Sequence, residues 1–195
     1  MANADIVNGL RPSRYMNGAP WTGQCTEYYI PSSDSTAVFV GDLVKFAGSA
    51  SSDGVATVAQ AAASGAVLGV VVGIRKDTPT SLDTPIYRAA STAAYVMVVD
   101  DPNVLFEIQE DGVGGALAVT NIGQNADIVV GSGSTTTGAS GMELDSSTAA
   151  TTATLPLKIM GFVRREDNEI GSANAKIVVK LNNHQLGSST GTAGV

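Results

Sequence analysis

Apolar and polar residues alternate along most of this chain. The clearest case is YVMVVDDPNVLFEIQED, residues 95–111, where apolar side chains recur at every second position on both sides of a DPN turn. Successive side chains of a strand point to opposite faces, so the pattern predicts two strands. Asp and Pro suit the first positions of a tight turn. The segment therefore predicts a β-hairpin with Phe106 facing the core.

Carboxylates crowd the same segment, which holds Asp100, Asp101, Glu107, Glu110 and Asp111. They fit three roles: a catalytic acid pair, a metal site, or residues that turn the chain in water. A catalytic pair needs a carboxyl whose pKa is shifted by burial or by a like charge, and nothing in the alternation indicates burial here. We therefore predict turns rather than chemistry. An acid pair formed in space by distant residues stays open.

Short β-branched runs separated by Gly, Asp and Asn recur through the rest of the chain. We predict strands at 36–40, 43–47, 66–74, 86–89, 117–120, 127–130, 157–165 and 175–181, a short one at 142–144, and one helical turn at 59–63. No amphipathic helix of useful length is evident. The predicted fold class is all-β, a sandwich or barrel, with a jelly roll as one option.

The chain divides into segments of different composition. Residues 1–35 lack a sustained period and predict an irregular N-terminal arm. Residues 36–187 form the predicted β-rich core domain, which includes a Ser/Thr/Gly-rich loop at 131–156, and residues 188–195 form a flexible tail.

The arm carries four residues of the types most enriched at binding hot spots: Arg11, Arg14, Tyr15 and Trp21. We take these four as candidate contacts with a partner protein or a neighbouring subunit. The alternative is that Trp21, the single Trp of the chain, covers the domain's own core.

Composition narrows the function classes. At 195 residues the chain is long enough for one domain with a real core. Its one Cys and one His cannot build a Cys/His zinc cluster, and no catalytic or phosphate-binding motif is found, so we predict no enzyme activity, no cofactor and no metal. No apolar run reaches the roughly 18 residues of a membrane span, so we expect a protein made in, and soluble in, a cytosol.

Charge is segregated along the sequence. The net charge is −7, and the stretch between Arg88 and Lys158 contains acids but no Lys or Arg. Nucleic-acid binding needs a cationic stripe, so we do not expect it. The segregation fits either an ordinary solvated acidic face or an acidic outward side with a more basic docking side.

Several stretches resemble one known family. They are GDLVKFAG, GVATVAQAAASGAVLGVVVGI, YRAASTAAYVMVVDDPNVLFEIQEDGVGGA, GSGSTTTGASGMELDSSTAATTATLPLKIMGF and KIVVKLNNHQLG. They are similar to head proteins of tailed bacteriophages that are described as capsid decoration, or cement, proteins. The resemblance covers nearly the full chain, from the arm to Gly187.

The resemblance implies a β-rich virion structural protein on the outer capsid surface, synthesised in the host bacterial cytoplasm. Its implied partners are a separate major capsid protein and neighbouring copies of itself, as a dimer or trimer, with no nucleic acid and no membrane. Its implied role is to stabilise the shell against internal DNA pressure. Two other classes stay open: a tail- or fibre-associated β-sandwich adhesin for host glycans, and a hydrolytic enzyme.

Overall fold

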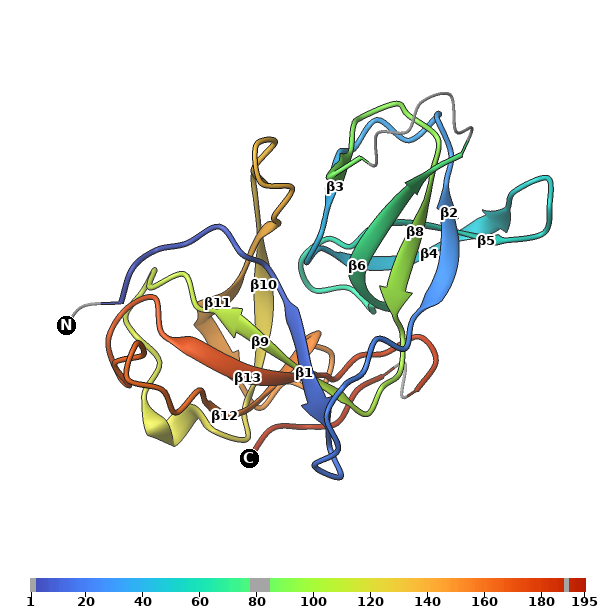
Figure 1. Ribbon diagram of the computed structural model, residues 1–195. Helices are drawn as coiled ribbons and strands as arrows, with labels where there is room; N and C mark the ends of the chain where they lie inside the picture. The colour runs from blue at the N-terminus through green and yellow to red at the C-terminus, as the bar shows by residue number, and fades with distance from the viewer. Residues whose placement is uncertain (1–2, 78–84, 188–189) are drawn as a thin grey trace.

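The computed structural model describes residues 3–77, 85–187 and 190–195. It confirms the predicted all-β class, with one closed barrel and one larger sheet lying side by side (Figure 1). A two-stranded sheet, β3 (Val38–Phe39) with β7 (Tyr87–Arg88), and a single 3-10 turn, η1 (Val119–Asn121), complete the described elements.

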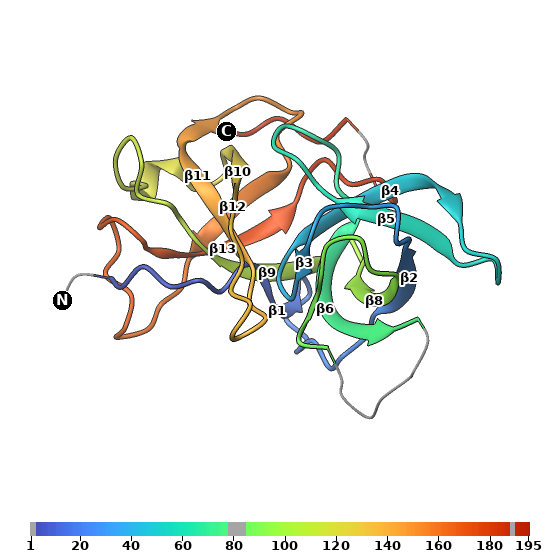
Figure 2. The same cartoon turned by 90° about the horizontal axis from the view of Figure 1, so that it is seen from above.

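The barrel closes in the order β2-β5-β4-β6-β8, and Figure 2 shows these strands arranged around a ring. Their bounds are β2 Thr26–Ile30, β4 Leu43–Ala50, β5 Ala56–Gln60, β6 Gly69–Lys76 and β8 Ala94–Val99. Inside lie small branched side chains such as Val44, Val58, Val71 and Val96, all 0% exposed. Short β-branched residues suit so narrow an interior, because a five-stranded barrel leaves room for little else.

The second sheet runs in the order β1-β9-β13-β12-β10-β11, with every neighbouring pair antiparallel. Its strands are β1 Arg11–Tyr15, β9 Val104–Gln109, β10 Asn125–Gly131, β11 Gly141–Ala150, β12 Leu157–Phe162 and β13 Lys176–Leu181. A bridge between Glu110 and Leu144 brings the end of β9 back to β11. The sheet therefore curls around its own apolar face.

The two parts share one core. Leu43, Val70 and Val99 of the barrel belong to the same buried cluster as Phe106 and Ile177 of the sheet. The 132–140 turn makes backbone hydrogen bonds with Val40, which follows β3 and packs against the barrel's interior cluster: Val40 N to Gly138 O and Ser140 N to Val40 O, each 2.9 Å. The fold is consequently one packed body.

Residues 95–111 do not form the predicted hairpin. β8 pairs with β2 and β6 in the barrel, whereas β9 pairs with β1 and β13 in the sheet. The turn between them instead carries the chain from one sheet to the other. Alternation predicts which face of a strand is buried, as it does for Phe106 at 0% exposed, but it does not name the partner strand.

Several predicted segments differ from the structure. Residues 1–35 contain β1 and β2, so these parts of the predicted arm are integral strands. The predicted loop 131–156 contains β11, whose hydroxyl side chains make hydrogen bonds such as Asp127 N to Thr148 Oγ1, 2.9 Å. β11 contains the predicted short strand at 142–144 and extends it through the Ser/Thr-rich residues 145–150, where hydrophobic alternation gives no signal.

Other differences are shorter. The predicted helical turn at 59–63 overlaps the end of β5, and the predicted strand at 117–120 overlaps η1. Of the predicted flexible tail, residues 188–189 lie outside the described part. Residues 190–195 lie against the sheet, with Gly194 N bonded to Thr151 O and Val195 N to Gly123 O.

Arg88 is a buried cation at the open end of the barrel, 1% exposed. Its guanidinium donates to the carbonyl oxygens of Thr92, Pro31 and Asp34 at 2.6–2.8 Å and to that of Thr36. The Asp34 carboxylate lies 3.6 Å from Nη1. A planar group with five donors can satisfy this many acceptors, and Lys cannot.

Replacing Phe106 by Ala should lower the free energy of unfolding by about 3–5 kcal/mol, because removing a large buried side chain leaves a cavity in a close-packed core. Urea denaturation measures the change. Val113→Ala, at a position 65% exposed, is the matched control and should change stability by less than about 0.5 kcal/mol. Equal effects of the two substitutions would contradict the assignment of Phe106 to the core.

Replacing Arg88 by Met should destabilise the fold by about 3 kcal/mol or more, since several buried carbonyls lose their donor at once. Arg75→Met serves as the control. The Arg75 side chain is 51% exposed in its ion pair with Glu27, so its loss should cost no more than about 1 kcal/mol. Thermal and urea unfolding of both variants compare the two sites.

Candidate functional site

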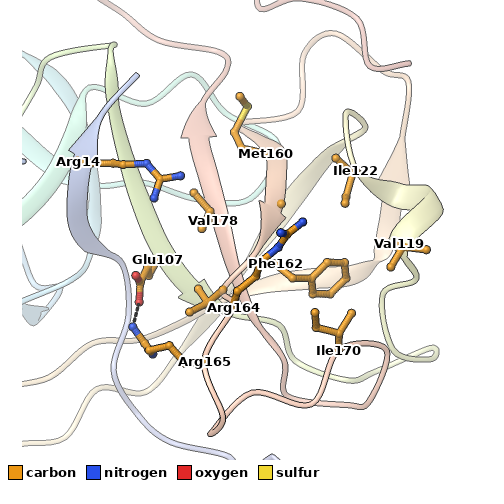
Figure 3. A pocket seen from close by; sticks show the side chains of 12 residues that line it. Arg14, Glu107, Val119, Ile122, Met160, Phe162, Arg164, Arg165, Ile170 and Val178 are labelled. Carbon is orange, nitrogen blue, oxygen red and sulfur yellow. Dashed lines mark hydrogen bonds and ion pairs between the residues drawn. The ribbon is translucent and has the colours of Figure 1, made fainter. Parts of the chain in front are cut away.

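A surface groove of about 580 Å³ lies over the outer face of the six-stranded sheet (Figure 3). Strands β1, β9, β12 and β13, the η1 turn and the segment after β12 all contribute to it. Its lining residues are Arg14, Glu107, Val119, Ile122, Met160, Gly161, Phe162, Val163, Arg164, Arg165, Ile170 and Val178. We call this the outer groove.

The outer groove is apolar where a solvated sheet face is ordinarily polar. The inward residues of β12 and β13, such as Ile159 and Ile177, fill the core, so Met160 and Val178 face outward. Four aliphatic side chains around the groove are well exposed: Val119 61%, Ile170 45%, Ile122 43% and Met160 38%. Clustered exposed apolar groups rimmed by charge are typical of an interaction surface.

Three arginines add positive charge to this apolar surface. Arg165 is paired with Glu107 at 2.9 Å and with Asp167 at 3.3 Å. Arg14 and Arg164 make no ion pair with any described residue, and Figure 3 shows Arg14 extending from β1 toward Val178. The groove therefore offers unpaired guanidinium groups beside apolar side chains, the combination favoured at protein interfaces.

The four contact residues predicted from the sequence fall in different places. Arg14 lines the outer groove. Arg11 lies on the other side of β1, where its Nε donates to Asn8 O at 3.1 Å. Tyr15 and Trp21 pack partly buried against the main core, and Trp21 Nε1 donates to Gln24 O at 3.1 Å. The packing of Trp21 favours the alternative that it covers the domain's own core.

The sequence reasoning missed the groove residues on and after β12. Met160, Phe162 and Arg164 lie in LKIMGFVRR, the predicted strand at 157–165, and are not among the predicted contact residues. The available signal was the outward parity of the apolar Met160, opposite the inward parity of Leu157 and Ile159. An apolar residue on both faces of a strand indicates that the second face is also covered by something.

Carboxylates do meet in space at the opposite end of β9. Glu110 is 0% exposed and accepts from Ala175 N at 3.4 Å and Gly112 N at 3.3 Å, so the expectation of no buried acid in 95–111 is wrong. Burial raises the pKa of Glu110. Burial, together with the charges of Asp5, Asp111 and Glu110 and a hydrogen bond with Asp5, raises the pKa of Glu143 to about 7.

These four carboxylates, of Asp5, Glu110, Asp111 and Glu143, form an acidic cluster. Its hydrogen bonds have a structural role. Asp111 Oδ1 accepts from Val113 N at 3.1 Å and from Ser146 N and Oγ at 3.1 and 2.8 Å, which ties the turn after β9 to β11. Asp101 likewise caps its own turn by accepting from Asn103 N at 2.8 Å. Asp100 instead accepts from the hydroxyl of Tyr28 at 2.8 Å, across the barrel strands.

Within the described residues, no group of three or more His, Cys, Asp and Glu side chains could hold a metal ion. No described helix is long and apolar enough to span a membrane. Comparison with family models, with curated proteins and with solved structures found no match to this chain.

The acidic cluster predicts a pH dependence of stability. The folded-state pKa of Glu143, about 7, lies above its ordinary value of 4.5, so the folded state binds more protons between these values. The free energy of unfolding should therefore fall as pH rises from about 4.5 to about 7, and then level off. Urea denaturation at pH 5, 6, 7 and 8 measures the slope.

Glu143→Gln should flatten this slope and raise stability at pH 8, because the neutral amide removes one charge from the cluster. Glu166→Gln changes an exposed acid of the segment after β12 and should leave the slope unchanged. An equal slope in the wild type and in Glu143→Gln would contradict the electrostatic role assigned to Glu143.

Proposed function

We propose that this chain is a bacteriophage virion structural protein that decorates the outside of the capsid and cements it. The observation that carries the proposal is the outer groove, an exposed apolar surface with unpaired arginines on a closely packed β-body. The resemblance to head decoration proteins supplies the partner, a separate major capsid protein. In this role the protein is not an enzyme and uses no cofactor or metal.

The groove has the features of a binding surface of modest size. Met160 and Ile170 would be buried in the contact, and Arg14 and Arg164 would meet carboxylates or carbonyls of the shell. Arginine retains its charge and can bond two acceptors at once, which fixes orientation as well as affinity. A more basic docking side was one of the two interpretations of the segregated charge. The groove fits that interpretation.

Cementing follows from repetition rather than from the strength of one contact. Copies bound at equivalent positions of a symmetric shell multiply a modest interface, and a dimer or trimer of this chain would bridge neighbouring capsomers. A protein that binds only the assembled shell stabilises that shell by mass action. The shell then withstands more internal DNA pressure, with no contact to DNA and none to a membrane.

The test uses particles that lack this protein, to which purified protein is added back. Decorated particles should retain DNA to a higher temperature than bare ones, with saturation at a fixed number of copies per shell. Met160→Glu and Ile170→Glu place a charge in the outer groove and should weaken capsid binding by at least about tenfold. Occupancy is measured by sedimentation, and DNA release by dye fluorescence on heating.

Val113→Glu is the matched control, because Val113 is the more exposed at 65% and lies outside the groove. It should bind as the wild type does. Unfolding curves of the three variants separate lost binding from lost folding. Identical DNA release from bare and decorated particles, with the protein located on the tail by electron microscopy, would overturn the proposal in favour of a glycan-binding adhesin.

A further inference from the structure

A second, smaller cavity lies beside the outer groove. It has a volume of about 170 Å³ and is lined by Lys158, Lys180, His184 and Asn182, together with apolar groups that include Met160 and Met16. Met160 lines both hollows, so the two adjoin. We call this cavity the lysine pocket.

Two lysines face each other across the lysine pocket. Lys158 of β12 and Lys180 of β13 are directly opposed partners in the antiparallel ladder, where Cβ atoms lie roughly 5 Å apart. The pKa of Lys158 is lowered by burial and then by the charge of Lys180. Like charges in this position destabilise a sheet unless something negative lies between them.

Most of the donor capacity of these lysines is unused. Lys158 Nζ donates to Ala193 O at 2.9 Å and reaches Gly123 O at 3.5 Å. Lys180 makes no ion pair or side-chain hydrogen bond with any residue that the structure describes. By contrast Lys176, on the same strand, is paired with Asp167.

His184 forms one wall of the lysine pocket. Its ring is 1% exposed, and its Nδ1 accepts from Leu186 N at 3.0 Å. The proton of the neutral imidazole is therefore on Nε2, and this buried atom has no hydrogen-bond partner among the described residues. Because solvent does not reach the Nε2 atom, the imidazole is a wall of the pocket and not a donor to a bound ligand.

Asp100 and Asp101 are the acidic groups that act on His184. Their carboxylates are engaged elsewhere, by the Tyr28 hydroxyl and by Asn103 respectively. They do not neutralise the lysine pair by direct contact. Their charge weakens anion binding without filling the pocket.

We propose that the lysine pocket binds a phosphate-type oxyanion, held by Lys158 and Lys180. Lysine binds phosphate as a point charge with several donors, and a tetrahedral anion accepts from three directions at once. The volume of about 170 Å³ admits an ion of that size. Because the nearby aspartates oppose binding, we expect a dissociation constant on the order of 1 mM.

The test follows the single histidine of the chain by NMR, since its imidazole signals are unambiguous. Inorganic phosphate is titrated into the full chain at constant ionic strength, with sodium chloride as the balancing salt. The imidazole resonances should shift and saturate, because the anion binds beside the ring, and thermal stability should rise with the same midpoint. Chloride alone should do neither.

Lys180→Met should weaken phosphate binding by about tenfold or more. It should leave the fold at least as stable as the wild type without phosphate, because a repulsion is removed. Lys176→Met is the matched control on the same strand and should bind phosphate as the wild type does. No saturable shift up to 50 mM phosphate, or equal binding by Lys180→Met and the wild type, would overturn the proposal.

Phenyl phosphate, titrated in the same way, identifies the source of the anion. Binding of inorganic phosphate alone assigns the pocket to a free ion, and binding of both assigns it to a phosphate group carried by a larger molecule. The experiment needs only the isolated protein. Its outcome is therefore independent of whether the outer groove binds a capsid.

Discussion

Burial of one continuous apolar core across two sheets is the constraint on which the rest of this structure depends. Val99 ends the last barrel strand and Val104 begins the next strand in the other sheet, and both are 1% exposed in the same cluster. The turn between them can be short only because the barrel wall and the sheet are packed against each other. The position of every surface feature follows from that contact.

The shared core leaves the outer face of the six-stranded sheet uncovered. A strand has two faces, and in β12 and β13 the barrel side is filled by residues such as Ile159 and Val179. On the other face Val178 is buried in a small cluster with Leu105 and Val163, whereas Met160 beside it is 38% exposed. A partner is the natural cover for such a face, which is why the proposed function rests on this groove.

Like charges gather at two separate places on this framework. Glu110 and Glu143 meet where β9 returns to β11, and Lys158 and Lys180 meet where β12 pairs with β13. The first cluster is relieved by holding a proton, because the raised pKa of Glu143 keeps that carboxyl neutral at moderate acidity. Lysine does not lose its proton easily, and we propose that an anion from outside relieves the second cluster.

The sequence by itself determined the all-β class, because alternation and Gly, Asp and Asn turns leave no stretch for an amphipathic helix. It also determined the burial of Phe106, because parity along a strand fixes which side chains share a face. It named Arg14 as a candidate contact residue, and Arg14 lies in the groove. Each of these is a local property of the chain.

Only the tertiary structure decided which strands pair and which polar residues meet. The partners of β8 and β9 lie in different sheets, and no local pattern distinguishes that crossover from a hairpin. The predicted short strand at 142–144 is part of β11, and the remainder of β11 was missed because its Ser and Thr side chains carry little hydrophobic signal. The groove, the acidic cluster and the lysine pocket each join residues distant in sequence, and register between strands, which depends on the whole core, is what brings them together.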